Sequence, residues 1–208
     1  MHKKTISLII IAVVAVFVYI NIFGGKQISV SNVPEPKQTE AEGGTSFELN
    51  GYKVYIAFLN TYEMKALAVS SHHYYGFGLD NALSPVDLAV CWGSVAKNNG
   101  KINFHWHQGG RWVSWRLNSY DELAPIGSES DVNRQSANCH LIPANDSVKK
   151  VVMKMKAGDY VKIKGYLADI YGVNAAGNEF FWTSSTSRND TGAHACEVIY
   201  VTDAEILN

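Results

Sequence analysis

The stretch VKKVVMKMKAGDYVKIKGYLADIYG, residues 148–172, changes its hydrophobic period halfway and so decides the fold. Over residues 148–155, valine and methionine recur at the spacing of one helical face, after the capping sequence Asn145-Asp146-Ser147. From Gly158-Asp159 onward, apolar and charged residues alternate as in a strand, and Gly165 permits a bend or bulge. The stretch predicts a helix whose apolar stripe is a core face, followed by a long curled strand.

Most of the remaining chain also favours strands. Segments 46–60 and 62–71 are rich in aromatic and β-branched residues and predict two strands separated at Asn60-Thr61. Segments 179–185 and 194–201 predict later strands. The second of these is apolar on both faces except at Glu197, so we expect it to be central in its sheet.

Two short helices are expected within this strand-rich chain. One is the 148–155 helix, and the other is predicted over Pro85–Cys91, because Ser84-Pro85-Val86-Asp87 has a capping serine, a proline at the first helical position and an early acid. The predicted fold class is mainly β (α+β), a compact β-barrel or OB-like domain with one or two short helices. This analogy concerns shape and carries no function.

The segment FHWHQGGRWVSWRL, residues 104–117, predicts a β-hairpin. With Gly109-Gly110 as a two-residue turn, Phe104 and Trp106 face apolar partners on one side. His105, His107 and most other polar side chains then lie on the opposite side. A hairpin with one buried face follows from this register.

The N-terminus has the features of a membrane anchor. Residues 5–23, TISLIIIAVVAVFVYINIF, are uninterrupted by charge and long enough to cross a bilayer as a helix. No small-residue cleavage pattern follows, which disfavours a cleaved signal peptide. Lys3 and Lys4 precede the span, so the positive-inside rule predicts a single-pass protein of the bacterial cytoplasmic membrane, with its N-terminus inside and its C-terminal domain extracytoplasmic.

Composition divides and bounds the rest of the chain. Residues 24–46 are rich in Gly, Pro, Glu, Gln and Thr, and we expect a flexible tether there. Residues 47–208 are enough for one extracytoplasmic domain. The net charge of −1 gives no support for a nucleic-acid partner. We expect no cofactor. The expected partners are the membrane, through residues 5–23, and an envelope protein or surface polymer, while the oligomeric state stays open.

Three groups of residues were considered for chemistry, and the first is a metal site. His105 and His107 share a strand face, as do His194 and Cys196, and His140 could complete a site with nitrogen and sulfur ligands. Each pair alone is a weak signal, and a solvated polar face explains the hairpin histidines more simply. No metal site is therefore predicted.

The second group would make a cysteine nucleophile. His140, Asp190 and Cys196 occur in this order in a β-rich, membrane-anchored chain, an outline that resembles the sortases. The resemblance implies a His–Cys pair with an arginine that stabilises the oxyanion. The TLxTC motif is absent, however, and no arginine follows Cys196. The alternative is a buried strand cysteine or half of a disulfide. With Cys91 and Cys139 there are three cysteines, and the sequence does not choose a pair.

The third group is polar and suits ligand binding. The stretch SSTSRNDTGAH, residues 184–194, places Arg188 and Asp190 beside a glycine, which suits either an anion cradle or, as we favour, an internal Arg–Asp pair. His140 lies among small polar residues, and Arg116 lies on the polar side of the hairpin. The predicted binding residues are Arg116, His140, Arg188 and Asp190.

Four segments together resemble a known group of proteins: LSPVDLAVCWG, SANCHLIPAND, GDYVKIKGYLADI and FWTSSTSRNDTGAHACEV. The group comprises uncharacterised bacterial proteins with an N-terminal membrane anchor and one extracytoplasmic domain, and the resemblance spans most of residues 50–203. It implies the same architecture and no particular activity. The group has Met where this chain has Cys139, and it lacks the His-Trp-His of the hairpin.

Two functions remain open from the sequence. The first, which we prefer because no complete catalytic set is present, is a membrane-tethered, envelope-associated binding module. The second is an extracytoplasmic cysteine-dependent enzyme, a hydrolase or transpeptidase, that uses Cys196 and His140. These hypotheses differ in one geometric requirement, since only the enzyme needs the two side chains within hydrogen-bond reach.

Overall fold

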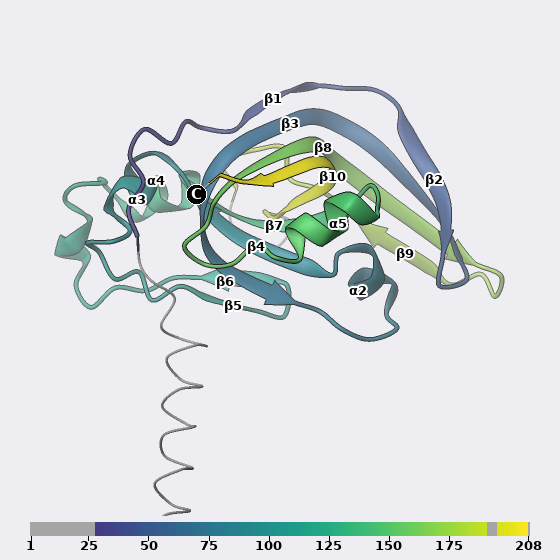
Figure 1. Cartoon of the computed structure of the whole chain (residues 1–208). Coiled ribbons are helices and arrows are strands. Elements are labelled where there is room, and N and C mark those ends of the chain that lie inside the picture. The colour runs from purple at the N-terminus through teal and green to yellow at the C-terminus, as the bar shows by residue number, and fades with distance from the viewer. Residues whose placement is uncertain (1–27, 191–194, 208) are drawn as a thin grey trace, which may run out of the picture.

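The computed structural model describes residues 28–190 and 195–207, and they form a mainly β domain (Figure 1). The predicted membrane anchor over residues 5–23 lies outside the described residues. Within residues 28–190 and 195–207, no helix is long and apolar enough to cross a membrane. The elements are, in chain order, β1 (Lys37–Glu40), β2 (Gly44–Leu49), β3 (Tyr52–His73), α2 (Leu79–Leu83), β4 (Val86–Cys91), α3 (Gly93–Asn98), β5 (His107–Gly109), β6 (Trp112–Ser114), the 3-10 helix η1 (Tyr120–Leu123), α4 (Glu129–Arg134), β7 (Ser136–Pro143), α5 (Asp146–Val152), β8 (Tyr160–Asn174), β9 (Glu179–Trp182) and β10 (Glu197–Ile206).

Five strands close into a ring of hydrogen-bonded neighbours. The path β3-β4-β7-β10-β8 returns to its start because β8 also pairs with β3. All of these pairs are antiparallel except β7 with β10, which run parallel. The interior holds the larger apolar core. At one end of the ring lie α3 and α4, while the β2–β3 and β8–β9 hairpins project at the other (Figure 1).

The helix-to-strand prediction is confirmed. α5 begins after Asn145, whose side chain accepts a hydrogen bond from the N–H of Val148, and Met155 is buried. The irregularity expected at Gly165 lies in its partner strand, since the register of β10 with β8 shifts between Val201 and Asp203, and an added Cβ at Gly165 would lie 1.9 Å from the carbonyl oxygen of Tyr200. Only glycine permits so close an approach between β8 and β10. β10 is central, as expected, since it pairs on both sides.

A second apolar core lies outside the ring. It contains Ile142 of β7 and Val198 of β10, whose sequence neighbours Leu141 and Ile199 belong to the inner core. Because successive strand residues point to opposite faces, this second core covers the outer face of the ring. It also includes Leu79 and Leu83 of α2, together with side chains of β3, β8 and β9. The N-terminal part of β3 and the C-terminal part of β8, together with β2 and β9, thus form a second layer over that outer face.

The predicted helix over Pro85–Cys91 is wrong, because residues 86–91 form the strand β4. All six of its residues are buried, and it pairs with both β3 and β7. A strand buried on both faces has no polar alternation, so its pattern does not distinguish it from a short buried helix. Ser84 does not begin a helix; it is the C-cap of α2, and its hydroxyl donates to the Val86 carbonyl and to Asp87.

The predicted break at Asn60-Thr61 is also wrong. β3 runs without interruption for 22 residues, and only its register with β8 shifts between Phe58 and Asn60. The irregularity is a bulge rather than a turn, so the polar dipeptide bends the strand without ending it.

The prediction of a flexible tether over residues 24–46 is wrong for residues 28–46. β1 pairs with β3 from Lys37 to Glu40, and β2 forms a hairpin with β3. Val33 is buried in the inner core, and the side chain of Asn99 binds the Ile28 carbonyl. Backbone pairing with the long β3 holds this polar segment on the domain, although its composition offers little apolar surface.

The hairpin predicted over residues 104–117 has paired strands only over residues 107–114, and its turn lies one residue later than predicted. β5 and β6 pair His107 with Ser114 and Gly109 with Trp112, so the turn residues are Gly110 and Arg111. Both have positive φ, 58° and 69°, as a two-residue turn of this hand requires. Phe104 is nevertheless fully buried, as expected.

Candidate functional site

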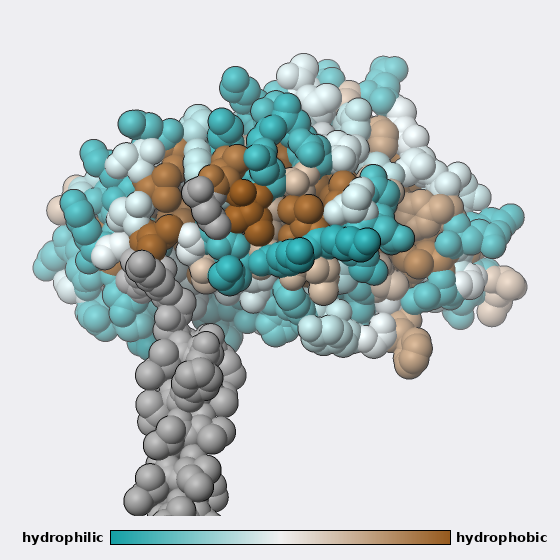
Figure 2. Space-filling model, viewed as in Figure 1, coloured by the Kyte–Doolittle hydropathy of each residue, from teal (hydrophilic) through white to brown (hydrophobic). Residues whose placement is uncertain are grey.

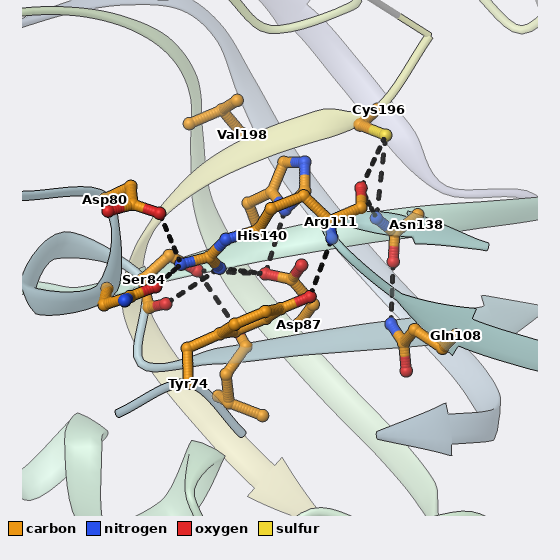
Figure 3. Close-up of polar contacts among 12 residues, drawn as sticks. Tyr74, Asp80, Ser84, Asp87, Gln108, Arg111, Asn138, His140, Cys196 and Val198 are labelled. Atoms are coloured by element: carbon orange, nitrogen blue, oxygen red, sulfur yellow. Dashed lines mark hydrogen bonds and ion pairs between the residues drawn. The ribbon is translucent and has the colours of Figure 1, made fainter. Parts of the chain in front are cut away.

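A buried polar cluster lies on the outer face of β4 and β7 (Figure 3). Asp87 of β4 stands directly opposite His140 of β7, and both side chains are almost inaccessible, with exposed fractions of 0% and 3%. Their sequence neighbours Val86, Leu88 and Leu141 point into the inner core. An acid in the middle of an apolar strand is costly unless a partner compensates its charge.

Arg111 supplies that compensation from the hairpin turn. Its Nη1 donates to Asp87 Oδ1 at 2.7 Å and to the Ser84 carbonyl at 2.9 Å, and its Nη2 donates to Asn81 Oδ1 at 2.9 Å. The guanidinium lies 3.5 Å above the ring centre of Tyr74 and 5.2 Å from that of Trp182. Figure 3 shows the guanidinium enclosed between Asp80, Ser84, Asp87 and Tyr74.

These contacts explain the register of the hairpin. A left-handed φ strains any residue other than glycine, and a turn at Gly109-Gly110 would avoid this strain. Arg111 takes the strained position because its guanidinium then reaches Asp87, and its main-chain N–H donates to the Tyr74 hydroxyl at 2.9 Å. Burial and the charge of Asp87 raise the pKa of Tyr74 to about 12, so this hydroxyl stays protonated.

His140 approaches the carboxylate without a well-aligned hydrogen bond. Its Nδ1 lies 2.9 Å from Asp87 Oδ1, yet the geometry leaves Nδ1 without a hydrogen-bond partner among the described residues. The imidazole packs against Trp182 with ring centres 4.6 Å apart. His140 is therefore held by packing and by proximity to the carboxylate.

Cys196 lies beside this cluster and contacts Asn138 rather than His140. Its Sγ is 3.6 Å from Asn138 Nδ2 and 3.9 Å from the carbonyl oxygen of Arg111. In the parallel pairing of β7 and β10, Val198 rather than Cys196 stands opposite His140. Burial raises the pKa of the Cys196 thiol to about 11, so it is protonated at neutral pH and is a poor nucleophile.

The cluster is not fully paired within the described part of the chain. Four of its buried polar atoms have no hydrogen-bond partner there: Asp87 Oδ2, Gln108 Oε1, Arg111 Nε and His140 Nδ1. Each such atom carries a desolvation cost of about 1–3 kcal/mol.

Arg188 belongs to a different site, on the inner face of the ring. Its Nη1 lies 3.6 Å from Glu197 and its Nε 3.4 Å from Glu35, and the predicted Arg188–Asp190 pair does not form. Asp190 instead accepts a hydrogen bond from Ser185. Burial raises the pKa of Glu197 to about 8, and the opposing effect of Arg188 is smaller.

A polar hollow of about 660 Å³ opens beside Arg188. It is lined by Glu35, Trp92, Gly93, Arg134, Gln135, Thr186, Ser187, Arg188 and Asn189. Cys196 precedes β10 and contacts Asn138 and Arg111 on the outer side, whereas Glu197 at the start of β10 lies against Arg188. The predicted residues therefore do not share one pocket, because His140 lies outside the ring and Arg188 pairs with Glu197 inside it.

The remaining predicted residues are scattered. Arg116 lies in the hairpin, where its main-chain N–H donates to the Phe104 carbonyl. Cys91, Cys139 and Cys196 are all free thiols, and the first two are buried. His194 lies outside the described residues. Within the described ranges, no three His, Cys, Asp or Glu side chains are grouped closely enough to hold a metal ion.

Sequence reasoning missed the residues at the centre of the polar cluster. The sequence pattern predicts Asp87 in the first turn of a helix, and it gives Arg111 no role. One signal was available: an aspartate inside the apolar run VDLAVC demands a buried cation, and the hairpin offers Arg111.

Comparison of the chain with known protein families, curated proteins and solved structures finds no match.

Proposed function

We propose that this chain is a membrane-anchored binding module whose ligand-binding domain is extracytoplasmic and OB-like. The anchor and the orientation are the predictions made from residues 5–23 and the flanking lysines. The proposed partner is an envelope protein or a surface polymer. Membership in the bacterial group resembled by the four segments is part of the same proposal.

The order of the ring strands supports the OB-like assignment. In chain order, the ring strands are first β3, then β4, β7, β8 and fifth β10. Around the ring they follow the order first, second, third, fifth, fourth, and the fourth pairs again with the first. The helix α5 connects the third and fourth strands. Barrels of this kind include oligonucleotide- and oligosaccharide-binding domains, so the fold is compatible with a binding module and does not by itself assign one.

One observation carries the choice of a binding module over an enzyme: the Cys196 thiol contacts an amide and a carbonyl, while His140 contacts Asp87. A thiol is activated by a neighbouring base or cation that favours the thiolate. Cys196 has a raised pKa instead, with burial as the main cause. The required nucleophile–base pair is therefore not assembled.

A thiol enzyme is the second candidate, and one observation favours it. Asp87 lies 2.9 Å from His140 Nδ1, which is where a carboxylate would orient a catalytic histidine. For this candidate to hold, His140 and Cys196 would have to meet in the working protein.

Alkylation of the full-length chain with iodoacetamide at neutral pH tests the choice. Mass spectrometry would follow each cysteine, with fully buried Cys91 and Cys139 as internal controls for intact folding. We expect slow labelling of Cys196. Rapid labelling that His140→Ala abolishes, while Cys91 and Cys139 stay protected, would overturn the binding module in favour of the enzyme.

A second experiment tests the orientation. A reporter fused after Asn208 should show extracytoplasmic activity. Cytoplasmic activity would refute both the predicted topology and the proposed envelope partner.

A further inference from the structure

The outer surface of the second layer carries a row of aromatic rings. Tyr55 of β3 pairs with Tyr171 of β8, and Tyr171 pairs with Phe181 of β9, so the three side chains are direct cross-strand neighbours. Their ring centres are 6.1 and 5.0 Å apart, with interplanar angles of 23° and 39°. Tyr55 and Phe181 are 47% and 67% exposed.

This row stands on the solvent side of a well-packed sheet. The alternate residues Val54 and Ile56 of β3, Ile170 of β8 and Trp182 of β9 contribute to or pack against the second core. The aromatic residues therefore do not fill the interior. Apolar residues also gather in patches on the face of the domain drawn in Figure 2, so exposed apolar surface is not confined to this row; what distinguishes the row is that its three aromatic rings are cross-strand neighbours in contact.

A groove runs beside the row. Its second row of residues is small or polar, since Gly44 pairs with Ala57 and Ala57 pairs with Asp169. The groove has a volume of about 520 Å³, within the usual range for ligand sites. The aromatic row thus forms one wall of the groove, and the small residues Gly44 and Ala57 with the carboxylate of Asp169 form its floor.

The polar groups of the groove are held in place. Asp169 Oδ1 accepts a hydrogen bond from the Ser184 N–H at 3.1 Å, which fixes the carboxylate on the floor. The Tyr171 hydroxyl donates to Glu179 at 2.8 Å, which fixes the central ring. A carboxylate accepts several hydrogen bonds, so Asp169 can also receive ligand hydroxyl or amide donors. Side chains fixed before binding lose little entropy when a ligand arrives.

We propose that this groove binds an extended β-1,4-linked glycan chain, with successive pyranose rings lying on Tyr55, Tyr171 and Phe181. The proposal rests on the proposed function as a binding module and names its site and ligand class. The distances of 6.1 and 5.0 Å between neighbouring ring centres are comparable to the length of one sugar unit along such a chain. The neighbouring rings are inclined by 23° and 39°, so the exposed parts of the row offer apolar surface to the C–H groups of sugar rings, and the carboxylate accepts their hydroxyl groups.

A nucleic acid is the competing ligand class, because its bases also stack on aromatic side chains. The charges in the groove disfavour it. The described lining residues of the groove include Asp169 and no lysine or arginine. Binding to a phosphate backbone depends on cationic side chains, so a neutral polymer suits this surface better. The shallow angles between the rings also differ from the enclosing cage that surrounds a quaternary ammonium group.

Calorimetric titration of the full-length chain tests the proposal, in a detergent without a sugar head group. The probes are cellohexaose, chitohexaose and a twelve-residue oligothymidylate. Phe181→Ala removes a largely exposed ring and Tyr171→Ala removes the central one, while Tyr171→Phe keeps that ring. Phe77→Ala is the matched control, because Phe77 is 99% exposed and does not line the groove.

We expect at least one hexasaccharide to bind, and each alanine substitution in the groove to weaken it about tenfold or more, as for a typical aromatic anchor. Phe77→Ala should bind like the unaltered chain, while Tyr171→Phe, which keeps the ring but loses the hydrogen bond to Glu179, should bind more tightly than Tyr171→Ala and more weakly than the unaltered chain. No binding of either hexasaccharide up to about 10 mM, in the weak range of Kd, would overturn the proposal. So would binding that survives both alanine substitutions, or oligothymidylate binding that Phe181→Ala removes. Thiol labelling tests the binding module separately, so a negative titration refutes the glycan site alone.

Discussion

Replacing Arg111 is the sharpest test of the polar cluster, because one side chain holds both a turn and a buried charge. Asp87 is fully buried, and the Arg111 side chain is only 17% exposed. Removal of one partner of a buried ion pair leaves an uncompensated charge and costs about 3–5 kcal/mol. We therefore expect Arg111→Ala to lower the free energy of unfolding by about this amount.

Two further variants separate charge from backbone strain. Arg111→Gly also removes the guanidinium but relieves the left-handed conformation, which costs about 1–2 kcal/mol in other residues. It should therefore be more stable than Arg111→Ala by about 1 kcal/mol. Adding Asp87→Asn to Arg111→Ala removes the stranded charge and should restore part of the loss. A double-mutant cycle would then show a coupling energy between the two positions.

The assay is urea denaturation of the full-length chain, followed by tryptophan fluorescence. Trp182 lies 5.2 Å from the guanidinium, so it reports on the site itself. Losses below about 0.5 kcal/mol for Arg111→Ala, the usual range for a surface substitution, would refute the view that the pair is buried and coupled. Equal stability of the alanine and glycine variants would refute the explanation of the hairpin register.

Three other predictions concern the cores. Phe104→Ala should cost about 3–5 kcal/mol, since the ring is fully buried, while half-exposed Trp112→Ala should stay within about 0.5 kcal/mol; urea denaturation of both measures the difference. Gly165→Ala should strongly lower the midpoint of thermal unfolding, because its Cβ would lie 1.9 Å from the Tyr200 carbonyl oxygen, and an unchanged midpoint would contradict this close approach. The pKa of Glu197 is raised in the folded state, to about 8 from 4.5, so the folded state binds the proton more tightly. Stability should decline as pH rises from about 4.5 to about 8, and Glu197→Gln should flatten this decline in a pH series of unfolding curves.

The sequence predicted those parts of the fold in which one physical effect dominates. α5 has both a cap and an apolar stripe. At Gly165 of β8, the close approach of the Tyr200 carbonyl leaves no room for a side chain. In these places local chemistry and tertiary structure require the same residue. Composition also limited the domain to a mainly β class, because aromatic and β-branched residues fill most segments.

Prediction failed where distant contacts outweigh local preference. Residues 86–91 carry a helix-start signature, yet pairing on both sides makes them a strand. The polar segment over residues 28–46 lacks apolar surface, yet backbone pairing with β3 orders it. Arg111 occupies a position that suits glycine, since Asp87 and Tyr74 attract it there. Most of these partners are distant in sequence; the exception is the β2–β3 hairpin, whose turn Asn50-Gly51 is a local hairpin signal.

The same limit explains why the predicted site residues did not converge. His140 and Cys196 were paired because each is chemically capable, but a sheet places residues by register and by face. Parallel pairing sets Val198 opposite His140, and Cys196, which precedes β10, contacts Asn138 instead. Register also makes the aromatic row, since Tyr55 is distant in sequence from Tyr171 and Phe181 and is adjacent to them across three strands. In a closed sheet of this kind, strand pairing decides which side chains lie next to one another. The chemistry of those side chains then decides which of the resulting groups can act as a site.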